Sequence, residues 1–412
     1  MRKGVCKITA VFMALSLVLS GCSLSNKDKS VEEASTESTS DTDVATVSGN
    51  DSGETASDNS GEASSESSII FVDDLSEPDL EGVVSDNSSD ADSESSTELL
   101  TSASEEYPVD EDCIMVFFGD SQIANGQSDG TDIPSLISKR VPYSRSFNLA
   151  IGGTTAAIEL TTANIQDYSN WTSKCFYGMV LAFEGTVDRN TLLADNPTTL
   201  ANMNNVDPSE VDFYFIEYGA NDFFGKIPLD KYGYDGDIDE LHTYYGALCR
   251  GIEKLKALSP NAKIILVSPF YGIYNDANGT YIGDSYVTSN GIGTLADYAK
   301  KAKNVSESEE TYYFDAMFMS KCDLYMDTAD QYLMDTVHLS LLGRQVFSRL
   351  LAHYPNWIMH YEPYPYLETD FIYIAEFNPD EYYRYRDDML LEYYPEYYER
   401  MMNGEYLLAQ PQ

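Results

Sequence analysis

The stretch that most constrains the fold is residues 114–127, IMVFFGDSQIANGQ. It opens with consecutive apolar residues and no polar alternation, a pattern that predicts a strand buried on both faces of a parallel sheet. Gly119, Asp120 and Ser121 end this strand and place a hydroxyl on the turn. Open α/β sheets carry their chemistry beyond the carboxyl ends of their strands. Ser121 is therefore a candidate nucleophile, which would need a base, a group that orients the base, and donors for an oxyanion.

Apolar runs and amphipathic stretches alternate over the rest of this region. Continuous apolar runs predict strands, and apolar residues spaced three and four apart predict helices. Further strands are predicted to end at Leu149 and Tyr218 and to lie within residues 262–270 and 311–317. Helices are predicted at residues 131–141, 175–193, 239–258 and 292–303, and an Asn-Gly pair predicts a β-hairpin within 274–286. Right-handed crossovers between such elements predict one parallel sheet covered by helices on both faces.

Two candidate oxyanion donors follow predicted strands. Gly152 and Gly153 precede a helix that we expect to begin at Thr154 or Thr155. Free backbone N–H groups at the positive end of a helix can donate to an oxyanion. A tight turn that requires a positive φ angle explains the same glycines without a catalytic role. Asn221 can donate a side-chain amide hydrogen, although asparagine is common in turns after strands.

A base is predicted in the loop before the last amphipathic helix. Asp335 and His338 lie three residues apart in this loop. One ring nitrogen of a histidine base must face the nucleophile, and a carboxylate on the other nitrogen fixes the tautomer. Of the other histidines, His242 lies in a predicted helix, and His353 and His360 fall beyond the last sheet element. The position of His338 favours it as the base.

Four short blocks, FFGDSQ, NLAIGGTT, EYGAND and DTVHLSLLG, occur in this order at strand ends or helix starts. Together they resemble the blocks of the GDSL or SGNH hydrolase family, and the resemblance covers roughly residues 112–357. It implies a three-layer α/β/α sandwich around a parallel, flavodoxin-like five-stranded sheet. The first block has Gln122 where the family has leucine, which we interpret as a change in packing beside the nucleophile.

The resemblance also implies roles for the candidate residues. Ser121 would be the nucleophile and His338 the base, with Asp335 behind the base. The backbone N–H groups of Ser121 and Gly153 and the side-chain amide of Asn221 would form the oxyanion hole. This chemistry requires no metal or other cofactor. Activity should rise with pH as His338 loses its proton, because only neutral imidazole can act as a base.

The N-terminal residues have the layout of an export signal. Arg2 and Lys3 precede an apolar run that ends in Leu-Ser-Gly-Cys. The run is too short for a stable membrane span, and its ending resembles the lipobox of bacterial lipoproteins. We therefore expect residues 1–21 to be a cleaved signal peptide and Cys22 to carry the lipid that anchors the protein on the outer face of the cytoplasmic membrane. An ordinary signal peptide with a chance cysteine is the alternative.

Composition changes sharply along the chain. Residues 22–107 are mostly Ser, Asp, Glu, Thr and Gly, and we expect a disordered acidic tether because they bury too little apolar surface to fold. A hydrolase domain would span 108–358. Residues 359–412 would form a tyrosine-rich acidic extension, whose rings either pack on the domain or stack on sugars. The net charge of −43 argues against nucleic acid as a partner, since phosphate binding needs a positive surface.

The sequence gives little sign of a metal or redox site. The cysteines of the expected domain show no Cys-x-x-Cys spacing, and their pairing stays open. They are Cys113, Cys175, Cys249 and Cys322. We expect Cys113 and Cys249 to behave as small buried hydrophobes. The alternating run of Asp235, Asp237 and Asp239 lacks the glycine that a calcium loop needs.

The function implied by the resemblance and the expected anchor is that of a cell-surface serine esterase. Its most suitable substrate would be an O-acetylated carbohydrate or wall glycan, because the family includes carbohydrate acetylesterases. An O-acyltransferase and a lipid or aryl esterase would use the same residues and are alternatives. A surface lipoprotein that binds glycan without catalysis is the alternative of a different class. The sequence does not indicate the oligomeric state.

Overall fold

The structure is a computed structural model of the chain. It describes residues 112–160, 167–232, 238–276 and 278–411. These residues belong to one compact unit, Glu98–Gln412. The predicted signal peptide, Cys22 and the acidic tether lie outside the described residues, as do Asp235 and Asp237. None of the helices in the described ranges combines the length and apolar character that a membrane crossing requires.

A five-stranded parallel sheet forms the centre of the domain, with the strand order β2-β1-β3-β4-β7. Its strands are β1 (Cys113–Gly119), β2 (Ser144–Asn148), β3 (Phe213–Glu217), β4 (Lys263–Val267) and β7 (Tyr312–Phe314). This is the predicted flavodoxin-like order. Because the chain moves from β1 to one side and then returns to the other, the carboxyl end of β1 is a topological switch point, where such sheets bind ligands.

The central strands are buried on both faces. Every residue of β1 and of β3 is buried, which explains why both are apolar except for Glu217 at the end of β3. Phe117 of β1 stacks on Phe215 of β3 with ring centroids 4.6 Å apart. A strand packed on both faces cannot shift in register without exposing its side chains. The residues that follow β1 and β3 are therefore held in fixed positions.

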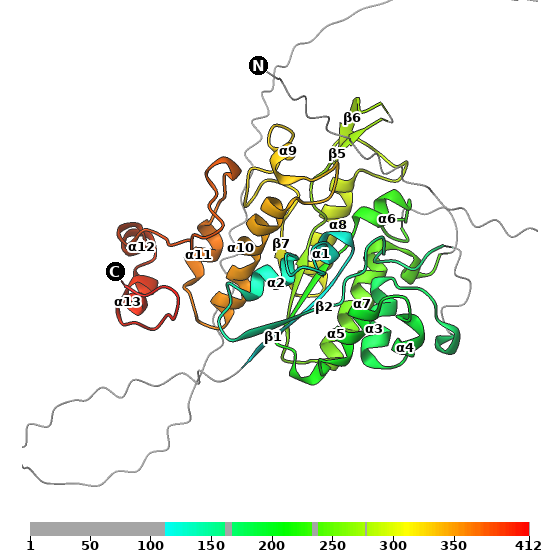
Figure 1. The fold of residues 1–412 in the computed structure, drawn as a ribbon, viewed down its shortest axis with the longest axis horizontal. Coiled ribbons are helices and arrows are strands. Elements are labelled where there is room, and N and C mark those ends of the chain that lie inside the picture. Colours follow the sequence, from blue (N-terminus) through cyan, green and yellow to red (C-terminus); the bar gives the residue numbers. More distant parts are fainter. Residues whose placement is uncertain (1–111, 161–166, 233–237, 277, 412) are drawn as a thin grey trace, which may run out of the picture. The chain divides into compact units, whose positions relative to one another are not determined.

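Helices cover both faces of the sheet (Figure 1). On one face α2 (Ile133–Ser138) packs on α10 (Leu341–Ile358). On the other face α7 (Tyr244–Leu258) packs between α3 (Phe176–Glu184) and α8 (Leu295–Ser308). Shorter helices are α1 (Ser121–Ala124), α4 (Arg189–Leu192), α5 (Pro197–Asn204), α6 (Ala220–Phe224) and α9 (Ala329–Tyr332). Single 3₁₀ turns lie at Tyr168–Asn170, Pro208–Glu210, Glu240–His242 and Ile374–Glu376.

The helix predicted from Thr154 or Thr155 is not formed. Residues 154–160 are turns, bends and irregular backbone, and 161–166 lie outside the described residues. The carboxylate of Asp222 accepts the backbone N–H groups of Ala156 and Ala157 at 2.9 and 3.1 Å. A carboxylate distant in sequence thus satisfies N–H groups at the expected helix start, and the local pattern cannot reveal it.

The helix predicted at residues 175–193 is interrupted. It ends at Glu184 because Gly185 adopts a left-handed φ of 90°, and the chain resumes as α4. The backbone N–H of Gly185 donates to carbonyl groups of Leu181 and Ala182, which closes the helix end. Such a glycine closure is a common way to end a helix.

The predicted hairpin is present as β5 (Ile273–Asn275) and β6 (Tyr281–Asp284), which pair antiparallel. Gly272, just before it, packs against the loop that carries His338. A Cβ at Gly272 would lie 3.0 Å from the carbonyl oxygen of Thr336, and the N–H of Ile273 donates to that oxygen at 2.9 Å. The hairpin base therefore supports the loop of the candidate base.

Beyond α10, the tyrosine-rich extension contains three helices. They are α11 (Tyr364–Thr369), α12 (Asp387–Tyr393) and α13 (Pro395–Met402). An apolar cluster of its own buries Tyr366 and Tyr406 together with Leu390 and Met401. Packing thus accounts for the burial of these tyrosines. This agrees with the first of the two alternatives predicted for the extension, in which its rings pack and do not stack on sugars.

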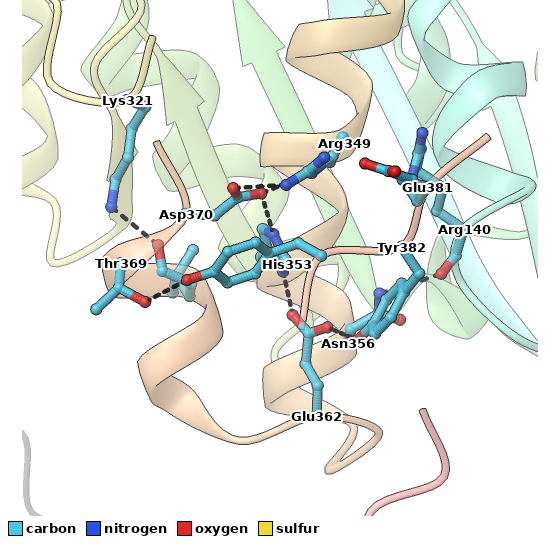
Figure 2. Close-up of polar contacts among 12 residues, drawn as sticks. Arg140, Lys321, Arg349, His353, Asn356, Glu362, Thr369, Asp370, Glu381 and Tyr382 are labelled. Atoms are coloured by element: carbon cyan, nitrogen blue, oxygen red, sulfur yellow. Dashed lines mark hydrogen bonds and ion pairs between the residues drawn. The ribbon is translucent and has the colours of Figure 1, made fainter. Parts of the chain in front are cut away.

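A cluster of charged and polar groups with a buried centre joins α10 to the extension (Figure 2). His353 of α10 lies between the carboxylates of Glu362 and Asp370. Arg349 forms two hydrogen bonds of 2.8 Å with Asp370, and the hydroxyl of Tyr382 donates to Glu362. We call these five residues the junction cluster. Its members make the extension an integral part of the domain and not a loosely attached tail.

The cysteines of the domain, whose pairing the sequence left open, are all free thiols. Cys113 is fully buried, as predicted for a small hydrophobe, whereas Cys249 is only partly buried. Burial raises the pKa of both thiols to about 12, so neither has the low pKa of a reactive cysteine.

Candidate active site

Ser121 lies at the carboxyl end of β1 and is the first residue of α1. Asp120 caps this short helix by accepting the backbone N–H of Gln122 at 2.9 Å. Gly119 allows the tight turn, because a Cβ there would lie 2.6 Å from the side chain of Ile123. The end of the buried strand thus fixes Ser121 at the switch point of the sheet.

His338 joins Ser121 to Asp335. Its Nε2 lies 2.9 Å from the Ser121 hydroxyl oxygen, and its Nδ1 lies 2.7 Å from Oδ2 of Asp335. Since an ionised carboxylate can only accept, Nδ1 carries the hydrogen and Nε2 is left to accept from the serine hydroxyl. The other oxygen of Asp335 accepts the backbone N–H groups of Val337 and His338 at 2.8 and 2.7 Å. These bonds fix the carboxylate, which in turn fixes the imidazole that contacts Ser121.

The ionisation of this pair follows from its hydrogen bonds. The bond to Asp335 raises the pKa of His338 above its usual value, although burial opposes the shift. Burial disfavours the charge of Asp335, but the hydrogen bonds from His338 and Val337 outweigh it and lower the Asp335 pKa to about 2. Asp335 is therefore ionised at neutral pH. His338 loses its proton at a higher pH than an isolated histidine does.

Gln122 holds the loop of His338 from both sides. Its side-chain amide donates to the carbonyl oxygen of Val337 at 2.6 Å and accepts the N–H of Leu339 at 3.1 Å. Our interpretation of Gln122 as a change in packing is therefore incomplete, because the side chain is bonded to the two neighbours of His338. The sequence does contain a signal for this role. Glutamine stands where the family has leucine, and a buried side-chain amide requires hydrogen-bond partners.

The glycine pair lies beside Ser121. A Cβ at Gly152 would be 3.6 Å from the Cβ of Ser121, and Gly153 adopts a φ of 80° with open space where its side chain would be. The left-handed backbone of Gly153 therefore favours glycine, and the turn brings Gly152 next to the candidate nucleophile. The predicted contribution of a helix dipole is wrong, since no helix begins at this turn.

Asn221, in α6, reaches the same end of the sheet. Its amide nitrogen donates to Oδ2 of Asp120 and to the carbonyl oxygen of Thr154, both at 3.0 Å. These bonds use both amide hydrogens. An oxyanion on a substrate would have to replace the Thr154 carbonyl as an acceptor, while Asp120 keeps the amide in place.

All the candidate site residues of the domain thus meet at one end of the sheet. They are Ser121, Gly153, Asn221, Asp335 and His338. In the part of the chain that the structure describes, no group of three or more His, Cys, Asp or Glu side chains converges as metal ligands would. The geometry suits nucleophilic attack by a serine with a histidine base.

A sequence model of the family described as GDSL-like Lipase/Acylhydrolase matches residues 115–351, which is more than half of the chain. The chain belongs to this family. Its members are hydrolases that act on ester bonds, so the protein is an enzyme of that class. The match ends within α10 and leaves out the extension.

Solved structures that match this GDSL-family chain share little sequence with it. A protein from Lactobacillus plantarum is 20% identical, with 59% of this chain and 95% of that chain covered and a TM-score of 0.40. A possible lipase from Chitinophaga pinensis is 18% identical, with coverages of 58% and 96% and a TM-score of 0.38. The acetylxylan esterase Axe2 from Geobacillus stearothermophilus is 16% identical, with coverages of 59% and 93% and a TM-score of 0.34. Curated proteins give no match.

Proposed function

We propose that the protein is a serine esterase with Ser121 as nucleophile, His338 as general base and Asp335 as the group that orients the base. The observation that carries this proposal is the continuous line of contacts from Ser121 Oγ to His338 Nε2 at 2.9 Å and from His338 Nδ1 to Asp335 at 2.7 Å. A base must lie within hydrogen-bond reach of the proton that it takes.

The reaction proceeds in two halves. His338 takes the hydroxyl proton as Ser121 attacks the ester carbonyl, and the resulting imidazolium gives this proton to the departing alcohol. Water then attacks the acyl-enzyme, again with His338 as base, and releases the acid and free Ser121. Asp335 stays ionised and stabilises the imidazolium that forms in each half.

The oxyanion hole consists of the backbone N–H groups of Ser121 and Gly153 and the side-chain amide of Asn221. These groups would donate to the oxygen of a substrate attacked by Ser121, because fixed donors of this kind stabilise the charge that develops in the transition state. Asn221 is supported from behind by Asp120 at 3.0 Å, which leaves its second hydrogen for the oxyanion once the Thr154 carbonyl is displaced.

The proposed substrate is an O-acetylated glycan at the cell surface, with the enzyme anchored through lipid on Cys22. Aromatic rings near the loop of the base support a sugar ligand. Tyr271 packs on Tyr286 and Tyr325 with ring centroids 5.4 and 5.6 Å apart, directly before the glycine that contacts the loop. Tyr325 is 38% exposed. Exposed tyrosine faces offer apolar contact to a sugar ring while their hydroxyl groups stay hydrated.

The test is acetate release by the full chain from a panel of acetylated glycans and from an aryl acetate. Ser121→Ala should lower turnover by about 10³-fold or more. Ser128→Ala, which alters an exposed serine a few residues away, is the matched control and should keep wild-type turnover. Glycan turnover lost only in Ser121→Ala supports the proposal and identifies the polymer.

Other outcomes would change the proposal in stated ways. Turnover of the aryl acetate alone would support a serine esterase but reject the glycan substrate. Transfer of acetyl to an added sugar alcohol, faster than release to water, would favour an O-acyltransferase. Absence of both activities, with glycan binding intact in Ser121→Ala, would favour a binding protein.

A further inference from the structure

A cluster of three buried carboxyl groups lies directly behind the candidate active site. Asp120, Glu217 and Asp222 are each no more than 1% exposed. Glu217 is the last residue of β3 and pairs in register with Gly119, the residue before Asp120. Its side chain contacts the carboxyl group of Asp120. Three negative charges at this depth would repel one another strongly, so the hydrogen-bond partners decide which group is neutral.

The partners of the three groups differ. Asp222 accepts two backbone N–H groups, and Asp120 accepts the N–H of Gln122 and the amide of Asn221. Burial raises the pKa of Asp120 to about 6 and that of Asp222 to about 7, while these donors favour the charged forms, so both groups ionise more readily than Glu217. Glu217 is less well supplied: neither of its oxygens makes a well-aligned hydrogen bond with the described residues, and only a weaker interaction with the backbone N–H of Asp120 favours its charged form. An ionised Glu217 would be buried with this weak donor and next to another carboxylate, so a hydrogen between Glu217 and Asp120 belongs on Glu217.

We propose that Glu217 is a positioning residue that carries a proton and donates it as a hydrogen bond to Asp120, which in turn holds the Asn221 amide toward the substrate. This inference rests on the proposed function, because it assigns Asn221 to the oxyanion hole. The chain of contacts runs from Glu217 through Asp120 to Asn221. A fixed acceptor behind an oxyanion donor removes the cost of reorienting that donor during the reaction.

The surroundings of Glu217 favour the neutral form. Burial, followed by the charges of Asp120 and Asp222, raises its pKa well above the usual value for glutamate. Burial also raises the pKa values of the neighbouring Tyr218 and Tyr244, so their hydroxyl groups stay uncharged at neutral pH. Loss of the proton would place two adjacent negative charges behind the oxyanion hole. Activity should therefore fall at alkaline pH through this group.

Two substitutions test the proposal with an aryl acetate as substrate. Glu217→Gln replaces the carboxylic acid by an amide that can still donate to Asp120, and it should keep most of kcat and lose the alkaline fall in the pH profile. Glu217→Leu fills the space without a donor, and it should lower kcat by about 10- to 100-fold with little change in KM. Glu210→Leu, at an exposed glutamate, is the control and should match the wild type.

Equal loss of kcat in both Glu217 variants, or none in Glu217→Leu, would overturn the proposal. Infrared spectroscopy gives a second readout. It requires no substrate, and it does not depend on whether the Glu217→Leu variant folds. The wild type at pH 7 should show the carbonyl band of a protonated carboxylic acid that is absent in Glu217→Gln, and identical spectra would overturn the proposal. Failure of the proposed function would be seen in a different variant: Ser121→Ala would then turn over the substrate as fast as the wild type does.

Discussion

Two histidines of the domain, His338 and His353, each contact one side chain on each ring nitrogen. Their surroundings nevertheless favour opposite charge states of the imidazole ring. His338 contacts the Asp335 carboxylate on Nδ1 and the Ser121 hydroxyl on Nε2, and its side chain is 31% exposed. His353, in the junction cluster, contacts a carboxylate on each ring nitrogen and is 3% exposed (Figure 2). The second partner is a hydroxyl in one case and a carboxylate in the other.

This second partner determines whether a proton can move. A hydroxyl can donate, so neutral His338 satisfies both of its neighbours and keeps a lone pair on Nε2. Two carboxylates can only accept, so His353 must carry hydrogen on both nitrogens. Burial alone would lower the His353 pKa, but Glu362 and Asp370 outweigh it and raise this pKa to about 9. His338 is suited to act as a base, and His353 is a fixed cation that balances buried charge.

The largest effect that this comparison predicts is on activity. His338→Ala should lower kcat for an aryl acetate by about 10³-fold or more, because the base is removed, while the melting temperature stays close to that of the wild type. His360→Asn is the control: this exposed histidine has a left-handed backbone, which asparagine tolerates. If His338→Ala kept the wild-type kcat, His338 would not be the base, and the proposed difference in role between His338 and His353 would be wrong.

His353→Leu should have the reverse effect. The substitution leaves the carboxylates of Glu362 and Asp370 without their shared cation, and breaking a buried ion pair on one side costs about 3–5 kcal/mol of unfolding free energy. Denaturant unfolding should show this loss, while kcat per folded molecule stays near the wild-type value. A stability change below about 1 kcal/mol would show that His353 does not hold the buried charges in balance.

A rise in pH should increase the activity that depends on His338 and decrease the stability that His353 provides. The pKa of His338 is raised by Asp335, and activity needs the neutral ring, so kcat/KM should be low below that pKa and rise as pH passes through it. His353 is more basic in the folded than in the unfolded protein. Its stabilisation is therefore complete below about pH 6.5, the ordinary histidine value, and is lost as pH rises through about 9.

Melting temperatures between pH 6 and 10 and kcat/KM over the same range would separate the two histidines. The alkaline loss of stability should be absent in a His353→Leu/Glu362→Leu double variant, because the titrating imidazole is gone and the remaining Asp370 keeps Arg349 as its cation. A loss of the same size in that variant would assign the effect to other groups.

The smallest predicted effect concerns the edge of the junction cluster. Arg349→Lys keeps the positive charge beside Asp370 but loses the bidentate contact of two 2.8 Å bonds and the packing of the guanidinium over Tyr383. The expected loss of unfolding free energy is about 1 kcal/mol. Arg386→Lys, at an exposed pair with Asp388, should change stability by less.

Sequence patterns predicted the sheet, the hairpin and the convergence of Ser121, Asn221 and His338, because strand ends in a parallel sheet meet at one edge. They failed where a distant side chain takes over a local backbone group. Asp222 accepts backbone N–H groups where a helix was expected after Gly153, and Gln122 bonds to a loop more than 200 residues away. Neither contact has a periodic signature, so both become visible only when the chain is folded.

The junction cluster also bears on the order in which the chain can complete its structure. Arg349 and His353 belong to α10, whereas Glu362, Asp370 and Tyr382 follow it in synthesis. A nascent chain that has released α10 but not the later residues holds Arg349 and His353 without the carboxylates that pair with them in the folded domain. The domain therefore cannot reach its final packing until the extension has emerged, which makes folding sensitive to completion of this C-terminal segment.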